Sequence, residues 1–233
     1  IKQQVDQSAG EYLLFTLYWL AFFLLVLPIP SNVILFILDD GSLVFNSNAI
    51  YLFISTFITA VLTLPFLKPT LGAQNKSDVI GRLAIKKVAL FSLIITVLLA
   101  AAYVLLEQWL FGFMEVTVPD FMLEVEAQTN SLLAKVLLLL GAVFIGPIYE
   151  EVIFRGVAFY RLKKTALGAS GAIIIPSIVF TLIHWQYDQV EIFISLFVFS
   201  CLVGLLRHLS GNLWYCIIAH MICNLLALGE IIW

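Results

Sequence analysis

The chain alternates long apolar runs with short polar connections. Most of the apolar runs reach the roughly 20 residues that an α-helix needs to cross the hydrocarbon core of a bilayer, and the fifth and sixth are shorter. This pattern predicts an all-α, polytopic membrane bundle of about seven transmembrane helices that forms a single domain over residues 1–233. The apolar segments are Tyr12–Leu38, Ala49–Leu67, Val88–Gly112, the run from Leu132 into the Glu150 region, Gly171–Trp185, Val190–Leu206 and Leu213–Ile232.

The composition supports a membrane protein. Hydrophobic residues make up 62% of the chain and charged residues only 12%, whereas a soluble domain has about 25% charged residues. The mean hydropathy is +1.07. The basic residues do not form a basic face, so nucleic acid is excluded as a partner.

The distribution of Lys and Arg predicts the orientation of the chain. If seven segments cross the bilayer, their connections alternate between the two sides, and 11 of the 12 basic residues, from Lys2 to Arg207, fall on one side, with only Lys135 on the other. The opposite connections carry acidic residues such as Asp39 and Asp40. By the positive-inside rule the N-terminus is cytoplasmic. The longest basic connection, 68–87, is either a short helix on the anionic inner leaflet or a solvated linker.

Two adjacent carboxylates and an arginine interrupt the fourth apolar run. Glu151 and Arg155 are spaced i,i+4, which predicts an ion pair on one helix face. At 3.6 residues per turn Glu150 points about 100° away from Glu151, so we expect Glu150 to face the chemistry and Glu151 to be held by Arg155. Pro147 leaves a carbonyl near Val143 without its helical donor and kinks the helix, which opens space beside Glu150.

Two further polar motifs lie in later apolar segments. His184 ends the fifth, and helical rise places it level with Glu150 across a hairpin. His220 and Asn224 share one stripe of the seventh, and both are costly in lipid. The set suits hydrolysis: Glu150 takes a proton from water, His184 shares or orients that water, and His220 and Asn224 donate to the oxyanion. A covalent nucleophile is not favoured, because no Ser or Cys has an obvious base partner in this set.

These motifs resemble those of the CPBP family of membrane proteins, which includes CAAX proteases and bacteriocin-processing enzymes. The family's EExxxR corresponds to Glu150–Arg155, its FxxxH to Phe180–His184, and its HxxxN to His220–Asn224. The resemblance covers residues 132–226 as a catalytic core and leaves 1–131 as a variable N-terminal part. It implies intramembrane endoproteolysis of a membrane-associated protein or peptide, with or without a prenyl group. It also assigns catalytic roles to Glu150, His184, His220 and Asn224, with Glu151 and Arg155 supporting them.

Other interpretations of the same residues stay open. The leading interpretation needs no cofactor, but Glu150, His184 and His220 are also the residues that would hold zinc or another divalent metal in a metalloprotease. A protein of another class, a bacteriocin immunity factor or membrane scaffold, would use the motifs only for interhelical bonding. The expected location is the cytoplasmic membrane of a prokaryote, with the active site toward the cytoplasmic side.

Overall fold

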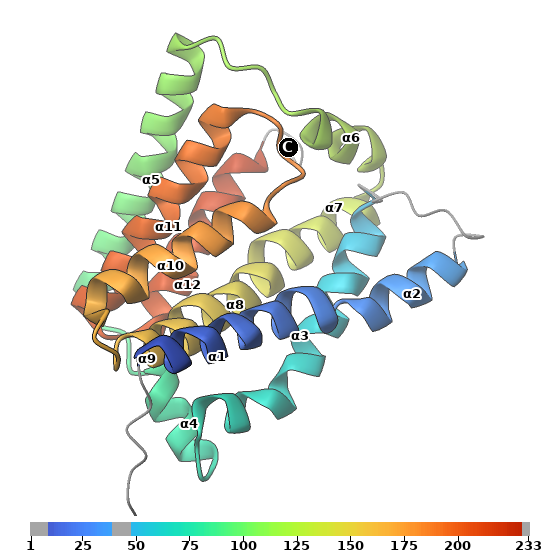
Figure 1. Cartoon of the computed structure of the whole chain (residues 1–233). Helices are drawn as coiled ribbons and strands as arrows, with labels where there is room; N and C mark the ends of the chain where they lie inside the picture. The colour runs from blue at the N-terminus through green and yellow to red at the C-terminus, as the bar shows by residue number, and fades with distance from the viewer. Residues whose placement is uncertain (1–8, 39–47, 230–233) are drawn as a thin grey trace, which may run out of the picture.

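The structure is a computed structural model that describes residues 9–38 and 48–229. Lys2, Asp39, Asp40 and the end of the seventh predicted segment at Ile232 lie outside the described residues. Within those two ranges the regular structure is entirely helical (Figure 1). The helices are α1 (Ala9–Ala21), η1 (Phe22–Val26), α2 (Ile29–Leu38), α3 (Ala49–Leu71), α4 (Lys76–Leu83), α5 (Leu90–Phe113), α6 (Asp120–Gln128), α7 (Leu132–Leu138), η2 (Leu139–Ile145), α8 (Gly146–Glu151), η3 (Val152–Ala158), α9 (Phe159–Leu162), α10 (Gly168–Ile183), α11 (Val190–Ser210) and α12 (Leu213–Ala227).

Five helical stretches in the described residues are long and apolar enough to span a membrane. They are Gly10–Ile37, Ala49–Leu71, Leu90–Phe113, Leu132–Leu162 and Val190–Ser210. Two further apolar helices, α10 and α12, are shorter. The prediction that the sixth segment is short is therefore wrong, because α11 continues to Ser210 and is a full candidate span. The chain is a multi-pass membrane protein, while seven crossings and a cytoplasmic N-terminus stay predictions.

Two proline residues follow stretches of π-helix. Pro28 lies just after η1, and Pro147 lies just after η2 in the helix that runs from Leu132 to Leu162. Proline has no backbone N–H, so the preceding turn loses a helical hydrogen bond and widens to the π pattern. The fourth helix therefore continues past the glutamates as predicted, but it does not keep a regular α-helical phase.

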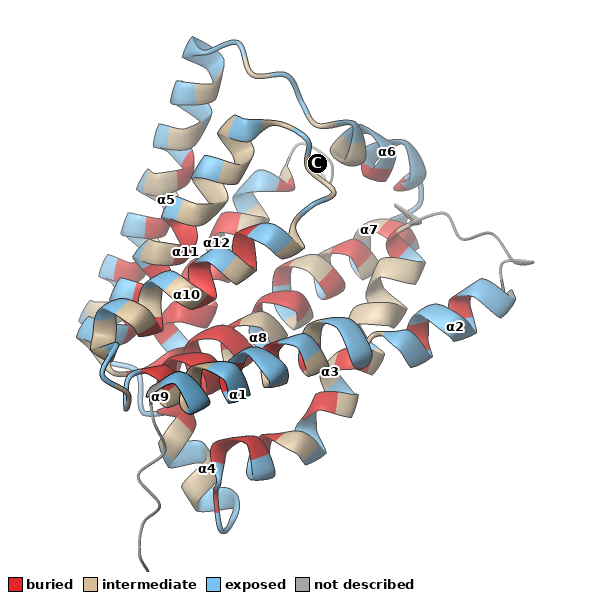
Figure 2. Cartoon of the chain, in the orientation of Figure 1, coloured by how far each residue is buried: buried red, intermediate tan, exposed pale blue. Residues whose placement is uncertain are grey.

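The fourth helix lies at the centre of the packing. α12 packs against its η2 and α8 parts and also against α5 and α11, and α10 packs against α11 and α9. The residues from Ile153 to Phe159 are all buried. Figure 2 shows that buried residues concentrate along this helix and α12, whereas α2 and α5 expose much of their surface. Polar side chains on the fourth helix are thus placed in the interior of the bundle.

The basic connection between the second and third spans contains the helix α4 (Lys76–Leu83). The Asn75 side chain caps it by accepting from the Asp78 N–H, and it ends where Ala84 adopts a left-handed conformation, with φ of 56°. The helix lies close against η3, since a Cβ on Gly156 would come within 2.6 Å of Leu83. Of the two predicted forms of this connection, the structure has the helix. Its contact with the inner leaflet stays a prediction.

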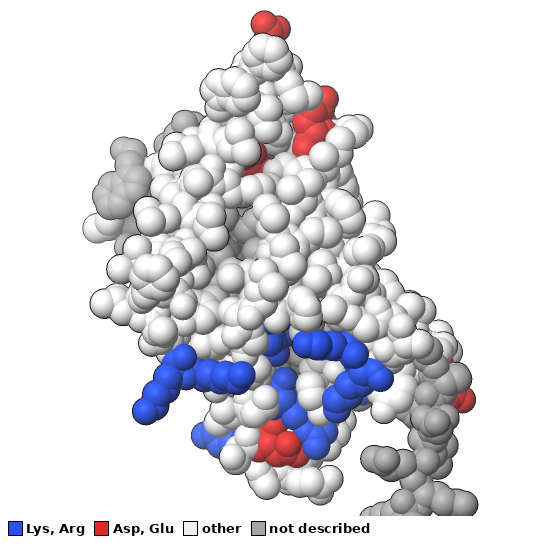
Figure 3. Space-filling view, turned by 90° about the vertical axis from the view of Figure 1, so that its left-hand side faces the viewer, with Lys and Arg blue, Asp and Glu red and all other residues white. Residues whose placement is uncertain are grey.

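Charged residues are separated along the length of the molecule. On the face shown in Figure 3, Lys and Arg form a band near one end that also contains acidic side chains, and the other end carries Asp and Glu without any Lys or Arg. This is the asymmetry on which the predicted orientation depends.

Candidate active site

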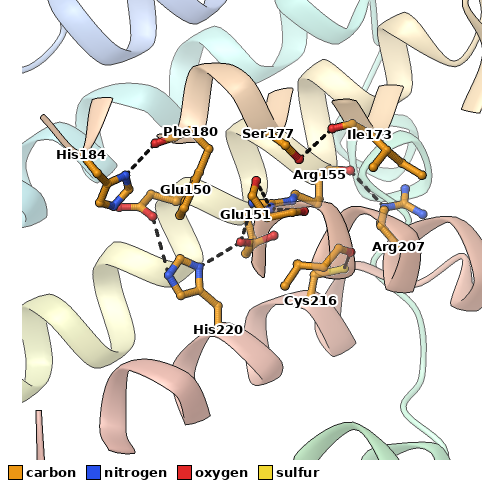
Figure 4. Close-up of polar contacts among 12 residues, drawn as sticks. Glu150, Glu151, Arg155, Ile173, Ser177, Phe180, His184, Arg207, Cys216 and His220 are labelled. Atoms are coloured by element: carbon orange, nitrogen blue, oxygen red, sulfur yellow. Dashed lines mark hydrogen bonds and ion pairs between the residues drawn. The ribbon is translucent and has the colours of Figure 1, made fainter. Parts of the chain in front are cut away.

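Glu151 is the buried centre of the polar cluster. Its side chain is 0% exposed, and its Oε1 accepts a hydrogen bond of 2.9 Å from Nη1 of Arg155, which is 3% exposed. Nη2 of Arg155 donates to both the carbonyl and the hydroxyl of Ser200 on α11, each at 2.8 Å. The predicted ion pair between Glu151 and Arg155 is confirmed. The pair is part of a fixed network that connects the fourth helix to α11 (Figure 4).

His220 lies between the two glutamates. Its Nδ1 is 2.9 Å from Oε1 of Glu151, and its Nε2 is 3.8 Å from Oε2 of Glu150. The Glu151 carboxylate is bound to the cationic Arg155 and can only accept a hydrogen bond, so Nδ1 of His220 carries the proton in this contact. Nε2 of His220 is directed toward Glu150. Glu150 has a 23% exposed side chain, whereas His220 is buried at 4%. Glu150 is thus the member of this group that a ligand can reach.

This geometry corrects the helix-phase argument. Glu151, and not Glu150, is the carboxylate closer to His220, and it contacts Arg155 and His220 at the same time. Both glutamates lie in the α-helical segment α8, so the offset of about 100° between them holds. It does not keep Glu151 away from the histidine, because His220 meets Glu151 through Nδ1 and approaches Glu150 through Nε2.

His184 is fixed at the end of α10. It is the C-cap residue, and its Nδ1 is 2.7 Å from the carbonyl oxygen of Phe180. The carbonyl can only accept, so Nδ1 is the donor and Nε2 remains open. The Phe180 ring lies 4.5 Å from the His184 ring and 5.8 Å from the His220 ring, measured between centroids. Phe180 therefore holds both histidines in one cluster, and Figure 4 shows Glu150 on the side of the cluster where these rings lie.

Asn224 contacts the backbone of the fourth helix. Its Nδ2 donates to the carbonyl of Ala142 at 2.8 Å. The Gly146 N–H bonds to Gly141, and Pro147 has no N–H, so Ala142 loses the helical donors that lie four and five residues ahead. The carbonyl without a helical donor is therefore that of Ala142, the residue next to Val143, which agrees with the prediction of such a carbonyl near Val143. This bond uses one of the two N–H groups of the Asn224 carboxamide.

Sequence reasoning missed a further carboxylate, which lies within another span. Glu107 on α5 makes a short hydrogen bond with Ser195, and the Ser195 hydroxyl lies 2.6 Å from that of Tyr103. The Tyr103 ring packs on Phe199, whose ring centroid is 5.1 Å from that of His220. The signal was present in the sequence, because Glu107 is a charged residue within an apolar run just as Glu150 is.

Tyr187 was also missed. It lies in the connection after α10, and its ring is parallel to that of His184 at 6.4 Å. Its hydroxyl contacts Met122 of α6. Burial raises the pKa of Tyr187 to about 12, and the nearby charges of Glu150 and Glu107 add to the effect. The residue therefore stays a neutral phenol beside His184, although no motif marks it.

Glu150, His184 and His220 are the side chains that could offer donor atoms to a metal ion. Nδ1 of each histidine is engaged, by Phe180 and by Glu151, so a metal held by Glu150, His184 and His220 would have to meet both Nε2 atoms. Within residues 9–38 and 48–229, no three His, Cys, Asp or Glu side chains are arranged to hold a metal ion. Engaged Nδ1 atoms leave Nε2 free, as in many metal-binding histidines, so a site held by Glu150, His184 and His220 stays a prediction, and no catalytic step is derived through a metal.

Comparisons with known proteins point to one family. Residues 132–226 match the model of the Rce1-like family, described as type II CAAX prenyl endopeptidase Rce1-like. The matched region contains all three motifs. It also contains Arg155 and His220, the two residues that contact the buried Glu151. No curated protein and no solved structure gave a significant match. Residues 132–226 are thus similar to the Rce1-like family of type II CAAX prenyl endopeptidases, and this match supports the resemblance to the CPBP family that the three motifs indicated.

Proposed function

We propose that this protein is an intramembrane endopeptidase that hydrolyses a peptide bond near the C-terminus of a membrane-associated protein or peptide, with Glu150 as the general base. One observation carries the proposal. A partly exposed carboxylate, Glu150, faces a histidine whose other nitrogen is fixed by a buried chain of contacts through Glu151 and Arg155. The similarity of residues 132–226 to the Rce1-like family supports the reaction class.

The residues divide the work of hydrolysis as follows. Glu150 accepts a proton from water, and the resulting hydroxide oxygen bonds to the scissile carbonyl carbon. His184, with Nδ1 tied to Phe180, presents Nε2 to orient that water. The C–N bond then breaks, and the proton held by Glu150 passes to the leaving amine nitrogen. This sequence balances without a cofactor.

The developing oxyanion needs hydrogen-bond donors. His220 donates from Nε2 when that nitrogen carries a proton, while Glu151 keeps the ring in place through Nδ1. Asn224 provides its remaining carboxamide N–H, with its orientation fixed by the bond to Ala142. The proposal places the site toward the cytoplasmic side of the membrane, because the fourth helix runs from the site into the basic end of the molecule.

The direct test is the isosteric variant Glu150→Gln in purified protein reconstituted in vesicles, assayed with a fluorescent CAAX-type peptide with and without a prenyl group. Loss of the base should lower kcat by at least about 100-fold. The thermal unfolding midpoint should not change, since Glu150 is partly exposed. The control Glu124→Gln, an exposed glutamate on α6, should retain full activity.

Cleavage at the wild-type rate by Glu150→Gln would refute the proposal. If that variant instead lost cleavage of every peptide but kept the cellular phenotype of the wild type, a non-proteolytic role as an immunity factor or scaffold would account for the phenotype. Strong chelation provides the remaining test. We expect activity to survive it, and a stoichiometric metal ion lost together with activity would identify a metalloprotease.

A further inference from the structure

A polar cavity of about 240 Å³ lies at the basic end of the molecule, away from the candidate active site. α1, the end of α3, α4 and α9 form its walls, whereas the helices α10, α11 and α12 contribute no lining residue. Its chemistry comes from three cations and three aromatic rings. These residues are Arg82, Arg161, Lys164, Tyr12, Phe15 and Tyr160.

The two guanidinium groups are held in place by the protein. Arg161 donates from Nε to the buried Thr16 hydroxyl at 3.1 Å and from Nη1 to the Thr70 carbonyl at 2.8 Å. Arg82 donates from Nε to Asp78 at 2.9 Å and from Nη1 to the Leu71 carbonyl at 2.6 Å. These bonds use two of the five N–H donors of each group. Both cations are therefore positioned in advance, which lowers the entropy cost of binding a ligand.

Aromatic rings complete the walls. The Arg161 guanidinium lies over the Phe15 ring at 5.2 Å, and Lys164 Nζ lies over the Tyr160 ring at 3.7 Å and contacts its hydroxyl. The lining contains no carboxylate. Asp78, which pairs with Arg82 but does not line the cavity, offsets the charge of only one of the three cations. A cavity with this surplus of fixed cations favours an anion with several acceptor oxygens, and a phosphate group has that chemistry.

The surroundings of the cavity indicate where the phosphate comes from. α1 exposes apolar residues next to the cavity: Leu14 is 72% exposed, Phe15 52% and Tyr18 61%. α1 belongs to a candidate membrane span, so this surface meets lipid tails. Basic pockets between helices at the cytoplasmic end of a membrane protein bind anionic headgroups. A ligand with a phosphate at one end and hydrocarbon at the other satisfies both surfaces.

We propose that the cavity walled by Arg82, Arg161 and Lys164 is a binding site for the headgroup of an anionic phospholipid, whose acyl chains lie along the exposed face of α1. The chain provides a matched pair for the test. Lys163 and Lys164 are adjacent, exposed and equally charged, but only Lys164 lines the cavity, and Lys163 Nζ lies over Phe159 instead. A general attraction to the basic end depends on both residues equally.

The experiment measures lipid binding to delipidated protein in neutral detergent, by native mass spectrometry and by the shift of the thermal unfolding midpoint. The probes are phosphatidylglycerol, phosphatidylcholine and inorganic phosphate. We expect phosphatidylglycerol to bind and stabilise the wild type and Lys163→Gln. Lys164→Gln should weaken that binding about tenfold, as expected for one charge-assisted hydrogen bond, while its unfolding midpoint without lipid stays that of the wild type.

Several results would overturn the proposal. If Lys163→Gln and Lys164→Gln weakened binding equally, the lipid would be attracted only to the basic band in general. If phosphatidylcholine bound as well as phosphatidylglycerol, the site would not recognise the negative charge of the headgroup. A full shift with inorganic phosphate alone would make this a site for a free anion. If Lys164→Gln raised the KM of a peptide with a free C-terminal carboxylate and not that of its amide, the cavity would bind substrate. These binding readouts do not depend on the proposed peptidase activity.

Discussion

Two carboxylate–arginine pairs of this chain have the same spacing, the same order and the same length, but they lie in opposite environments. Asp78 and Arg82 on α4, like Glu151 and Arg155 on the fourth helix, are spaced i,i+4 with the acid first, and both N···O distances are 2.9 Å. The first pair is about a third exposed, at 30% and 27%, whereas the second is 0% and 3% exposed. Identical local patterns have therefore produced two different interactions.

The difference shows that burial, and not spacing, decides what such a pair does. Water screens the pair on α4, so it contributes little to stability and leaves Arg82 available to the neighbouring cavity. In the interior, each charge of the Glu151–Arg155 pair depends on its partner, because removing one leaves the other without compensation. The buried pair also positions His220, so a structural interaction becomes part of the site.

The largest effect should come from Arg155→Gln. It leaves the Glu151 carboxylate buried without its cation and removes the guanidinium bonds to Ser200, which should lower the free energy of unfolding by about 3–5 kcal/mol. Unfolding in mixed detergent micelles measures this value. The matched change Arg82→Gln on the exposed pair should have a much smaller effect, and equal losses in the two variants would contradict the comparison.

The second effect concerns activity and not stability. Glu151→Gln keeps an acceptor for Arg155 but weakens the hold on His220 Nδ1, so we expect kcat to fall by about 100-fold with little change in KM. The measurement is kcat per folded molecule, with the folded fraction taken from size-exclusion chromatography. A purely structural role for Glu151 would instead leave kcat per folded molecule unchanged and lower only the yield of folded protein.

The smallest effect should come from the exposed pair. The hydrogen bond from Arg82 holds the pKa of Asp78 below its ordinary value of 3.8. A carboxyl group whose pKa is lowered by folding stabilises the protein above that ordinary value, and the contribution disappears as the pH falls through the folded-state pKa. The unfolding midpoint of Asp78→Asn should therefore lie slightly below that of the wild type at neutral pH. The two should converge in acid, and a constant difference at every pH would exclude this electrostatic origin.

Much of the candidate site was predictable because it depends on residue types that a membrane tolerates only for a reason. Glu150, His184 and His220 are expensive in an apolar segment, so their positions alone marked them, and the pairing of Glu151 with Arg155 followed from one turn of helix. Glu107 is also an ionisable residue in an apolar segment, but no recognised motif surrounds it, so it was not predicted as a site residue. Tyr187 had no such signal, since an aromatic residue at a segment end is ordinary.

The sequence by itself determined that the chain is a bundle of apolar helices and that three polar motifs belong to one site. It did so because hydrophobic runs and isolated charges report directly on the cost of transfer into lipid. Only the tertiary structure decided that Glu151 bridges Arg155 and His220, that Asn224 bonds to Ala142, and that Arg82 and Arg161 share one cavity. The reason is geometric. π-helical turns break the regular phase on which sequence periodicity depends, and contacts between distant helices are set by packing that no local pattern encodes.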